Sequence, residues 1–496
     1  MFLKNGLTYQ DSHMAAPEEV TVSLTPMSLK GDGEAVGGPV LYREEGTVYV
    51  DGSDTHSMIV GDTGSMKTLR FVLPLIWTCA QAAESMLVVD PKGELTKKTW
   101  KHLKEKGYEV AVLDFRSPHS SPDQWNPLAR IADAYHRGAV GKQEAILLLN
   151  DLTANLFFGK PTKDPYWIES AGSFFMGIVL LMLAVEKRTD INMKNVLRWR
   201  YQNMLNGQLE SFFQQMPTDW EAYQCLAGTL LLDAQNTKSC ILSTFDQQMR
   251  LFKSSPALTE MLSSNSFNMR DLGRRKMAIF LVVPDEKNTY HGLATMFLSQ
   301  CYAALLEEAE KTGSRLPVRV NFVLEEFCNM PKLPELLPML TAARSRNIRL
   351  HLVIQSYGQL EAKYGTEDSR AVLDNCTNLI YLHSREMTFL NYISDLTGKN
   401  AYDRPLISAS RLQRLQKNET LIFHDRCYPF LVKDVPLIFD YPIELGNQMP
   451  EKGKKRRGKR KAFDQDEEAF EPVRVDALDS LTSDDFDAFL KKRAQF

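Results

Sequence analysis

The chain has 496 residues, which is enough for two or three domains, each with its own core. Its hydrophobic content of 44% and charged content of 24% are typical of globular proteins, and the net charge of −3 excludes a global attraction to nucleic acid. The seven cysteines include no Cys-x-x-Cys pair, which favours a reducing cytoplasm over a disulfide or zinc framework. The longest apolar runs, 71–80 and 174–185, fall short of the ~20 residues that a membrane-spanning helix needs, so we expect no membrane span.

The first part of the chain predicts alternating strands and helices after a polar start. Residues 1–40 are rich in Gly, Ser, Thr and Pro and are expected to be a flexible segment. Next we expect a hairpin strand, the strand 57–60, a glycine turn, an apolar helix opening at Lys67 and Thr68, the strand 86–90, a helix over 95–106 and the strand 110–113. This alternation predicts an α/β fold with a mostly parallel central sheet.

The middle of the chain has a different pattern. From 126 to 271 apolar residues recur at helical spacing without strand-like alternation, which predicts an inserted all-α domain. The strand and helix pattern then resumes, so that 41–125 and 272–445 together form the second predicted domain. Its further expected elements are strands at 277–283, 318–324, 348–354 and 376–382, edge strands within 421–437, and helices at 292–308, 335–346 and 387–397.

The last residues, 446–496, are predicted to be a charged, disordered tail. The basic run 452–461 would contact nucleic-acid phosphates or serve as a linker, and the linker is favoured. An acidic stretch follows, with apolar residues between 478 and 490 that would suit one short amphipathic helix for a partner.

The stretch between the strand 57–60 and the next helix has the pattern of a phosphate-binding P-loop. This pattern is Gly, four residues, Gly, Lys and Ser or Thr, and it holds phosphates on backbone N–H groups at a helix N-terminus. The candidate nucleotide-binding residues are Gly61, Asp62, Thr63, Gly64, Ser65, Met66, Lys67 and Thr68. Lys67 would reach the β- and γ-phosphates, and the hydroxyl of Thr68 would bind Mg²⁺.

Met66 departs from this pattern, because the residue before the lysine should be glycine. Glycine suits a close approach of the backbone, or a φ that other residues adopt at a cost. A methionine would crowd the phosphates or shift the loop. Hydrolysis of ATP therefore depends on how the loop accommodates Met66.

Two carboxylates, Glu325 and Glu326, follow the predicted strand 318–324. A P-loop enzyme needs one carboxylate in the magnesium shell and a second that orients or deprotonates the attacking water. We expect Glu325 to take the first role, as a metal ligand with Thr68, and Glu326 the second. A solvated turn after a core strand is the alternative if the pair is considered without the P-loop.

Further polar residues flank the predicted strands. Gln355 follows the strand 348–354, where α/β sheets bind ligands, and would sense the γ-phosphate. Arg344 or Arg346, just before that strand, would serve as an arginine finger for a neighbouring site, although solvated surface arginines are the default. Asp90, Lys92 and Glu94 follow the strand 86–90, where Glu94 also suits the first turn of the next helix.

The ordered set of motifs resembles the type IV coupling proteins, the TraG/TraD family of P-loop ATPases, over roughly residues 40 to 445. The stretches that carry the resemblance are the P-loop with 70–74 (RFVLP), 88–95 (VVDPKGEL), 125–128 (WNPL), 164–167 (DPYW), 323–327 (VLEEF), 343–348 (ARSRNI), 355–356 (QS) and 359–365 (QLEAKYG).

The resemblance implies a RecA-like nucleotide-binding domain with an inserted all-α domain that selects cargo. It implies ATP and Mg²⁺ as cofactors, held through Lys67, Thr68, Glu325, Glu326 and Gln355. It also implies a homo-hexameric ring that passes single-stranded DNA with its bound relaxase to the channel of a type IV secretion system. Most members carry N-terminal transmembrane helices, so the resemblance implies a soluble variant recruited to the inner face of the membrane, with a separate small membrane-anchoring subunit as its partner.

Two functional hypotheses follow. In the first, the chain is an ATP-driven motor that recruits relaxase-bound DNA and drives its transfer. In the second, it is a relative that no longer hydrolyses ATP and acts as a substrate-docking or assembly adaptor. Met66, and Glu325 at a position where the family usually has Asp, are the two departures that keep the second hypothesis open.

Overall fold

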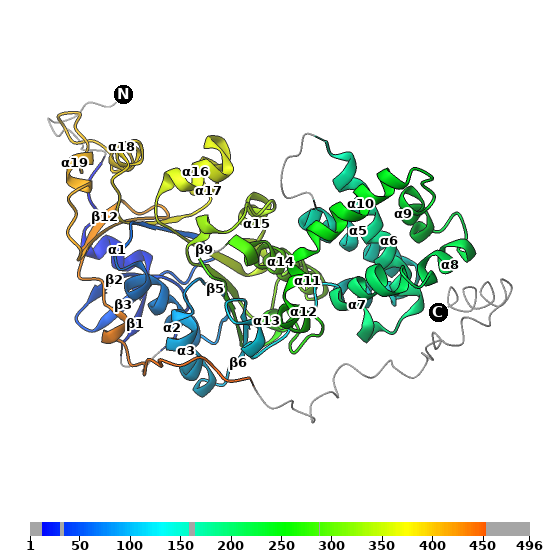
Figure 1. Ribbon diagram of the computed structural model, residues 1–496. Helices are drawn as coiled ribbons and strands as arrows, with labels where there is room; N and C mark the ends of the chain where they lie inside the picture. The colour runs from blue at the N-terminus through cyan, green and yellow to red at the C-terminus, as the bar shows by residue number, and fades with distance from the viewer. Residues whose placement is uncertain (1–11, 30–33, 158–163, 287, 453–496) are drawn as a thin grey trace. The chain divides into compact units, whose positions relative to one another are not determined.

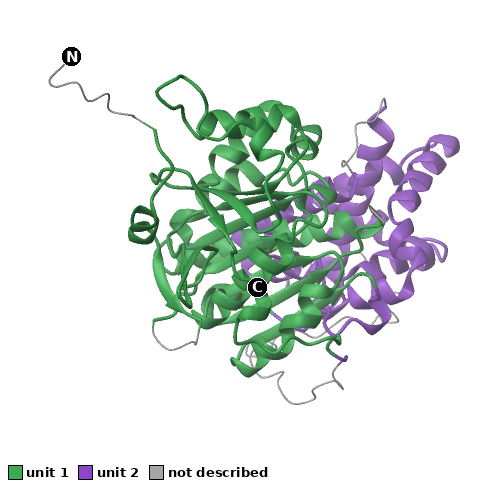
Figure 2. Ribbon diagram, turned by 90° about the vertical axis from the view of Figure 1, so that its left-hand side faces the viewer, with its two compact units in different colours: residues 1–116, 268–450 green, residues 117–267, 451–496 purple. Residues whose placement is uncertain are grey.

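The computed structural model describes residues 12–29, 34–157, 164–286 and 288–452. They form two compact units (Figure 2). The sheet unit comprises the residues up to 116 together with 268–450, and the helical unit is built from 117–267. The sequence pattern placed the limits of the helical domain at 126 and 271, whereas the structural division falls at 117 and 267.

The sheet unit contains a nine-stranded sheet with the order β12-β11-β10-β4-β9-β8-β5-β7-β6. The strands from β10 to β6 are parallel, and β11 and β12 continue the sheet in antiparallel fashion. The predicted, mostly parallel α/β fold is therefore confirmed. The strands are β4 (Ser57–Gly61), β5 (Ser85–Asp90), β6 (Glu109–Asp114), β7 (Met277–Val282), β8 (Val320–Leu324), β9 (Ile348–Ile354), β10 (Asn378–His383), β11 (Glu419–His424) and β12 (Phe430–Lys433).

Helices cover both faces of this sheet (Figure 1). The chain crosses the sheet toward β6 through α2 (Leu73–Gln81) and α3 (Glu94–Glu105). It crosses in the opposite direction through α14 (His291–Lys311), α15 (Leu336–Ala342), α16 (Tyr357–Tyr364) and α17 (Thr366–Asp374). Because parallel crossovers are right-handed, the two sets of helices lie on opposite faces. The unit also contains the helices α13 (Asp271–Arg274), α18 (Met387–Leu396) and α19 (Ala409–Leu412).

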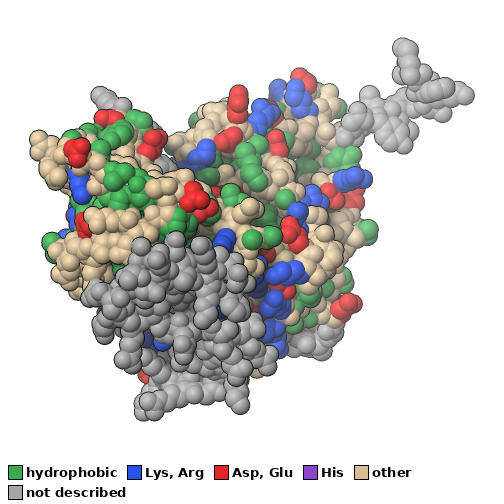
Figure 3. All heavy atoms as spheres, turned by 90° about the vertical axis from the view of Figure 1, so that its right-hand side faces the viewer, with side chains coloured by type: hydrophobic (Ala, Val, Ile, Leu, Met, Phe, Trp, Pro, Cys, Tyr) green, Lys and Arg blue, Asp and Glu red, His purple; other side chains and the backbone are tan. Residues whose placement is uncertain are grey.

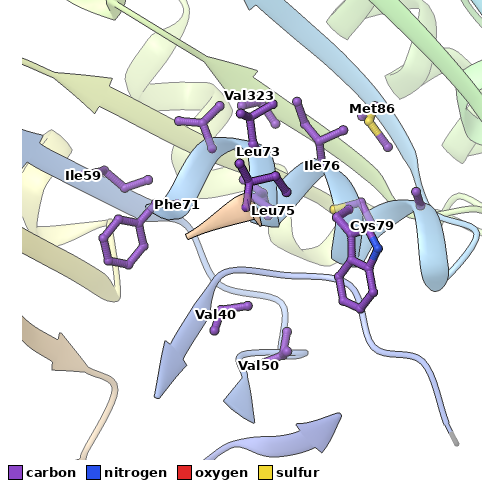
Figure 4. Packing of buried hydrophobic residues seen from close by; sticks show 14 of the residues in the cluster. Val40, Val50, Ile59, Phe71, Leu73, Leu75, Ile76, Cys79, Met86 and Val323 are labelled. Carbon is purple, nitrogen blue, oxygen red and sulfur yellow. The ribbon is translucent and has the colours of Figure 1, made fainter. Parts of the chain in front are cut away.

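The N-terminal segment is more ordered than its composition indicated. Helix α1 (Pro17–Ser23) leads to β1 (Thr25–Ser28), which joins β2 (Val40–Glu44) and β3 (Thr47–Val50) in a small antiparallel sheet. The prediction of a flexible segment is therefore wrong for 17–28. Val20 and Met27 are buried in the same apolar cluster as Val40 and Val50, which Figure 4 shows with Leu75 of α2. Contacts with residues far along the chain, rather than local pattern, order this segment.

The central helix of the helical unit is α6 (Tyr166–Val185), and other helices of the unit pack around it. Phe174 of α6 packs edge-on against Phe245, with 5.4 Å between ring centroids. The remaining helices are α4 (Ala129–Tyr135), α5 (Gly138–Phe157), α7 (Met193–Arg198), α8 (Gln208–Gln215), α9 (Glu221–Leu230), α10 (Gln235–Gln248), α11 (Arg250–Ser254) and α12 (Pro256–Met261).

Helix α6 is longer than the apolar run 174–185 indicated. Among the described residues it alone is long and apolar enough to cross a membrane, with a mean hydropathy of 2.0 over its most apolar window. Of that window, 72% is buried inside the molecule, which is the usual environment of a core helix. Length and composition alone are weak support for a membrane span.

The predictions for the basic run, the acidic stretch and the amphipathic helix fall almost entirely outside the described residues, which end at Lys452. All seven cysteines lie within the described part of the chain, and no disulfide joins them there.

Candidate nucleotide-binding site

The candidate site lies at the carboxyl ends of the parallel strands. The loop 61–68 follows β4, whose neighbours in the sheet are β9 and β10. The chain leaves β4 toward α2 on one face and leaves β9 toward α16 on the other. Two adjacent strands whose connections diverge in this way open a crevice at the end of the sheet, where α/β proteins bind ligands. The loop and Gln355 therefore stand on the two sides of this crevice.

Glycines are needed at two positions of the loop. A Cβ atom on Gly61 would lie 2.5 Å from Oγ of Ser65, so only glycine allows the loop to turn back this closely. Gly64 has a φ of +84°, in the left-handed region that favours glycine. Thr63 and Gly64 are exposed at the tip, whereas Ser65 is buried and donates a hydrogen bond to the carbonyl of Asp62 at 2.7 Å.

Met66 adopts a φ of +66°, so the position that should be glycine keeps a glycine-like backbone. This conformation is strained for a residue with a Cβ, at a cost of roughly 1 kcal/mol. At position 66 the backbone therefore has a conformation that favours the glycine expected from the P-loop pattern.

Lys67 is 7% exposed and its ammonium group lies inside the loop. Its Nζ donates to the carbonyl oxygens of Gly61 and Asp62, the second at 3.1 Å. Burial lowers the pKa of Lys67, while the carboxylates of Glu326 and Glu325 act in the opposite direction. Lys67 therefore supplies a positive charge within the loop, close enough to Glu325 and Glu326 for their carboxylates to affect its pKa.

Thr68 opens the helix that follows the loop, and its hydroxyl donates to Oε1 of Glu325 at 2.5 Å. The two predicted Mg²⁺ ligands are therefore in direct contact, although 257 positions separate them in the chain. Burial, together with the neighbouring carboxylates of Asp90 and Glu326, raises the pKa of Glu325 to about 7, although the hydrogen bond from Thr68 acts in the opposite direction. Carboxylates gathered in this way provide the negative charge that a bound divalent cation would neutralise.

The helix after the loop begins with a π-helical turn, Thr68–Val72, before α2. The sequence pattern predicted a regular α-helix here. Pro74 accounts for the difference, because a proline ring in a regular α-helix collides with the carbonyl four residues earlier. A wider turn relieves this contact and leaves Thr68 beside Glu325.

Glu326 and Gln355 form the second contact of the site. Nε2 of Gln355 donates to Oε2 of Glu326 at 2.7 Å. Glu326 itself has a φ of +51°, a strained conformation of the kind found at functional positions. Because β9 lies between β4 and β8, Gln355 stands between the loop and the carboxylate that would activate water.

Asp90, Lys92 and Glu94 also lie at this edge, after β5. Asp90 caps α3, since its Oδ2 accepts from the backbone N and from the hydroxyl of Thr96, both at 2.7 Å. Its other oxygen, Oδ1, is buried without a hydrogen-bond partner within the described structure. Lys92 carries a positive charge close enough to affect both Lys67 and Glu325. Glu94 forms an ion pair with Lys98 at 3.6 Å along α3. This contact stabilises the helix, which is the alternative to a role of Glu94 in the site.

The sequence analysis missed His383, which ends β10 on the other side of the loop. Its Nδ1 lies 2.9 Å from Oδ2 of Asp62, and its Nε2 lies 3.2 Å from the carbonyl oxygen of Gln413. This residue supports the loop from the side opposite Gln355. The rule that singled out Gln355, a polar residue at the end of a buried strand, would also have found His383.

Arg344 and Arg346 do not join this site within the chain. They form a 3₁₀ turn just before β9, at the amino edge of the sheet and thus opposite Lys67. Nε of Arg344 donates to the carbonyl of Asp54 at 2.8 Å. An arginine-finger role could be played only in the site of another subunit, and it stays a prediction.

The residues present fit a nucleotide with Mg²⁺. The loop offers a backbone cradle with positive φ at Gly64 and Met66, one buried ammonium group, and a hydroxyl in contact with a carboxylate. Lys67 and the loop would hold the phosphates, Thr68 and Glu325 would hold the ion, and Glu326 with Gln355 would face the transferred phosphate.

Comparisons with known proteins agree with this geometry. Residues 18–425 match the family described as Type IV secretory system Conjugative DNA transfer. Protein VirD4 of Rhizobium rhizogenes is 22% identical over 416 residues, which cover 83% of this chain and 60% of the relative. Conjugal transfer protein TraG of Escherichia coli is 23% identical over 410 residues, covering 76% of this chain and 61% of the relative. The chain thus spans about 60% of the length of these relatives.

The fold is also similar to solved structures of the plasmid coupling protein TrwB. The complex of TrwB with the ATP analogue ADPNP superposes with a TM-score of 0.62 at 16% identity, covering 89% of this chain and 97% of TrwB. The complex of TrwB with ADP and Mg²⁺ gives a TM-score of 0.58 at 15% identity, covering 89% of this chain and 94% of TrwB. At this identity the likeness shows a shared RecA-like fold. Because the family match extends over residues 18–425, most of the chain, the protein belongs to the type IV secretory family of conjugative DNA-transfer proteins.

Proposed function

We propose that this chain is the ATP-binding motor of a type IV coupling protein, which recruits relaxase-bound single-stranded DNA and drives its transfer to the secretion channel. The observation that carries the proposal is the meeting of Lys67, Thr68, Glu325, Glu326 and Gln355 at the carboxyl edge of one sheet. These residues come from the ends of three strands, and every predicted role except that of the arginine finger has its side chain in this group.

The chemistry assigned to them is phosphoryl transfer from ATP to water. Lys67 would offset the charge on the phosphates, and Glu325 would balance the charge of the ion held through Thr68. Glu326 would accept the proton of the attacking water, with Gln355 fixing the orientation of its carboxylate. TrwB in complex with ADPNP, and with ADP and Mg²⁺, supports the choice of nucleotide and ion.

The second candidate function is a substrate-docking or assembly adaptor that binds nucleotide without hydrolysing it. Met66 favours it, because its side chain starts from the loop where the phosphates would approach the backbone. The adaptor would retain the fold, the helical unit and nucleotide binding, and would lack turnover.

The partners form part of the same proposal. The family match supports a role with DNA and type IV secretion components. A homo-hexamer would place Arg344 of one subunit near the site of its neighbour. The location would be cytoplasmic, at the inner face of the membrane, through a separate small anchoring subunit.

The experiment is a phosphate-release assay with the full chain, Mg²⁺, ATP and single-stranded DNA. The motor predicts turnover that Lys67→Ala and Glu326→Gln both abolish, while Glu326→Gln retains binding of a fluorescent ATP analogue. Binding of the analogue without turnover would support the adaptor instead. Absence of both binding and turnover would refute the two candidates together. Lys332→Ala, which removes an exposed lysine paired with Asp368, is the matched control and should leave turnover unchanged.

A further inference from the structure

A groove of about 510 Å³ crosses the surface of the helical unit, and the nucleotide chemistry makes no use of it. It runs between α7 with the π-helical turn after it, Trp199–Asn203, and the pair α11 and α12. Leu197 and Phe252 contribute apolar surface, and Lys194, Arg198 and Lys253 contribute positive charge. Figure 3 shows one face of the molecule, on which lysine and arginine side chains lie among acidic and hydrophobic ones.

The lining carries three cations and one carboxylate, that of Glu260. Glu260 lies 3.6 Å from Lys194, but both side chains are mostly exposed, at 59% and 65%, so the pair is weak and open to exchange. Arg198 forms an ion pair with Glu186. The lining therefore combines an excess of positive charge with the apolar side chains of Leu197 and Phe252.

Lys253 is the most available of these charges. Its Nζ lies 4.4 Å from the ring centroid of Tyr201, and no ion pair with a carboxylate is formed by Lys253 in the part of the chain that the structure describes. The hydroxyl of Tyr201 donates to Asp246 at 2.8 Å, and Asp246 also accepts from Arg200 at 2.9 Å. Tyr201 is thus fixed in place and holds the ammonium group at the mouth of the groove.

The chain itself contains a segment of complementary chemistry beyond the described residues. Residues 462–496 contain ten Asp and Glu against four Lys and Arg. Apolar residues alternate with these charges, among them Leu478, Leu481, Phe486 and Phe489. The preceding run 453–461 is basic, so its charge has the same sign as that of the lysine and arginine side chains of the lining.

We propose that the acidic C-terminal segment, residues 462–496, docks in this groove of its own chain. Its carboxylates would pair with Lys194, Arg198 and Lys253, and its leucine and phenylalanine side chains would cover Leu197 and Phe252. The tether favours this occupant. Leu478 follows Lys452 by 26 positions in the same chain, and a covalently joined segment competes with free ligands at a raised effective concentration. Any other acidic ligand must displace the segment to reach the groove.

Site-specific photocrosslinking in the full chain tests the proposal. A benzophenone amino acid replaces Gln202, an exposed residue that lines the groove. The matched control places the same probe at Gln143, exposed on α5 of the same unit and outside the groove. After irradiation, mass spectrometry should find crosslinks from position 202 to peptides of 462–496, at least ten times more abundant than from position 143.

Mixing ¹⁵N-labelled and unlabelled chains identifies the source of the crosslinked segment. Crosslinks within one isotope class support docking in the same chain, and crosslinks between classes overturn it in favour of a second copy. Crosslinks to no tail peptide, or equal crosslinking from positions 202 and 143, also overturn the proposal.

Charge reversal provides the second measurement. Lys194→Glu with Lys253→Glu should lower the crosslink yield about tenfold, since two exposed ion pairs contribute a few-fold each. Adding Asp484→Lys and Asp485→Lys should restore most of it, and unchanged far-UV circular dichroism would show that the variants are folded. A crosslink yield that stays the same after the lysine substitutions and after the added aspartate substitutions would refute the electrostatic pairing. This result is independent of ATP hydrolysis, so the docking proposal and the motor proposal can fail separately.

Discussion

Replacing Glu325 with glutamine should stabilise the metal-free protein at alkaline pH. Glu325 is 8% exposed, and burial raises its pKa from 4.5 to about 7. Glutamine keeps an oxygen that accepts the hydrogen bond from Thr68, but it carries no charge that burial penalises. The substitution therefore removes the cost of the buried charge and retains the local geometry.

The pH dependence follows from proton binding. Between pH 4.5 and about 7, the folded chain holds a proton at Glu325 that the unfolded chain has released, so the free energy of unfolding falls as the pH rises through this window. At 1.36 kcal/mol per pKa unit, the full effect is about 3 kcal/mol. The Glu325→Gln variant should match the wild type at pH 4.5 and exceed it by about 2 to 3 kcal/mol at pH 8.

Urea unfolding in the presence of EDTA measures this difference. Cys79 of α2 is fully buried in the sheet unit, so its modification by a thiol reagent, followed by mass spectrometry, reports the unfolding of this unit alone. Glu308→Gln is the matched control of opposite sign, because a hydrogen bond from Arg274 lowers the pKa of Glu308. That variant should be less stable than the wild type at pH 8 and approach it as the pH falls. A Glu325→Gln effect that is equal at pH 5 and pH 8 would refute the reasoning.

Three further substitutions test the loop, the water-activating pair and the core of the sheet unit. Met66→Gly relieves the strain of a residue with a Cβ at a φ of +66°, so the free energy of unfolding of the sheet unit should rise by about 0.5 to 1 kcal/mol. Calorimetry should also show tighter binding of an ATP analogue. Gln355→Ala leaves Glu326 without its hydrogen bond, so turnover in the phosphate-release assay should fall at least tenfold with analogue binding retained. Arg349→Met removes the buried guanidinium that pairs with Glu84, whose carboxylate keeps only Arg319 at 3.4 Å and Asn321 at 2.9 Å, so urea unfolding should show a loss of stability of about 3 kcal/mol.

Each of these substitutions has a control. Glu45→Gly is the control for Met66→Gly. It relieves the strain of a residue at a φ of +42° in the turn between β2 and β3, so it should also stabilise the fold, but it must leave nucleotide affinity unchanged. If Gln355→Ala weakens the affinity for the ATP analogue, the role of this residue would be to bind the nucleotide rather than to support its hydrolysis. Adding Glu84→Gln to Arg349→Met should recover part of the lost stability, and a double variant that is as unstable as the sum of the two single ones would contradict the ion-pair account.

The sequence by itself determined the mostly parallel sheet and the candidate residues. Buried parallel strands are rich in apolar residues, although β8 and β9 also bury Asn321, Arg349 and His351. The side chains that follow these strands, Glu325, Glu326 and Gln355, are visible in the sequence as polar residues at the strand ends. The spacing of Gly61, Lys67 and Thr68 indicates a phosphate loop in spite of Met66, and the polar residues at the later strand ends support this prediction. The helical insertion is recognised because its apolar residues recur at helical intervals over a domain-sized stretch.

Only the tertiary structure decided which of these residues meet and in what state. The hydrogen bond between Thr68 and Glu325 depends on strand order, which no local pattern encodes. The positive φ of Met66 belongs to the turn between β4 and the helix after it, and the residue type alone does not predict it. The N-terminal strand, His383 beside Asp62, and the opposite placement of Arg344 likewise follow from contacts between residues distant in the chain. Such contacts contribute their free energy only when the whole sheet has formed, so neither propensity nor spacing reveals them.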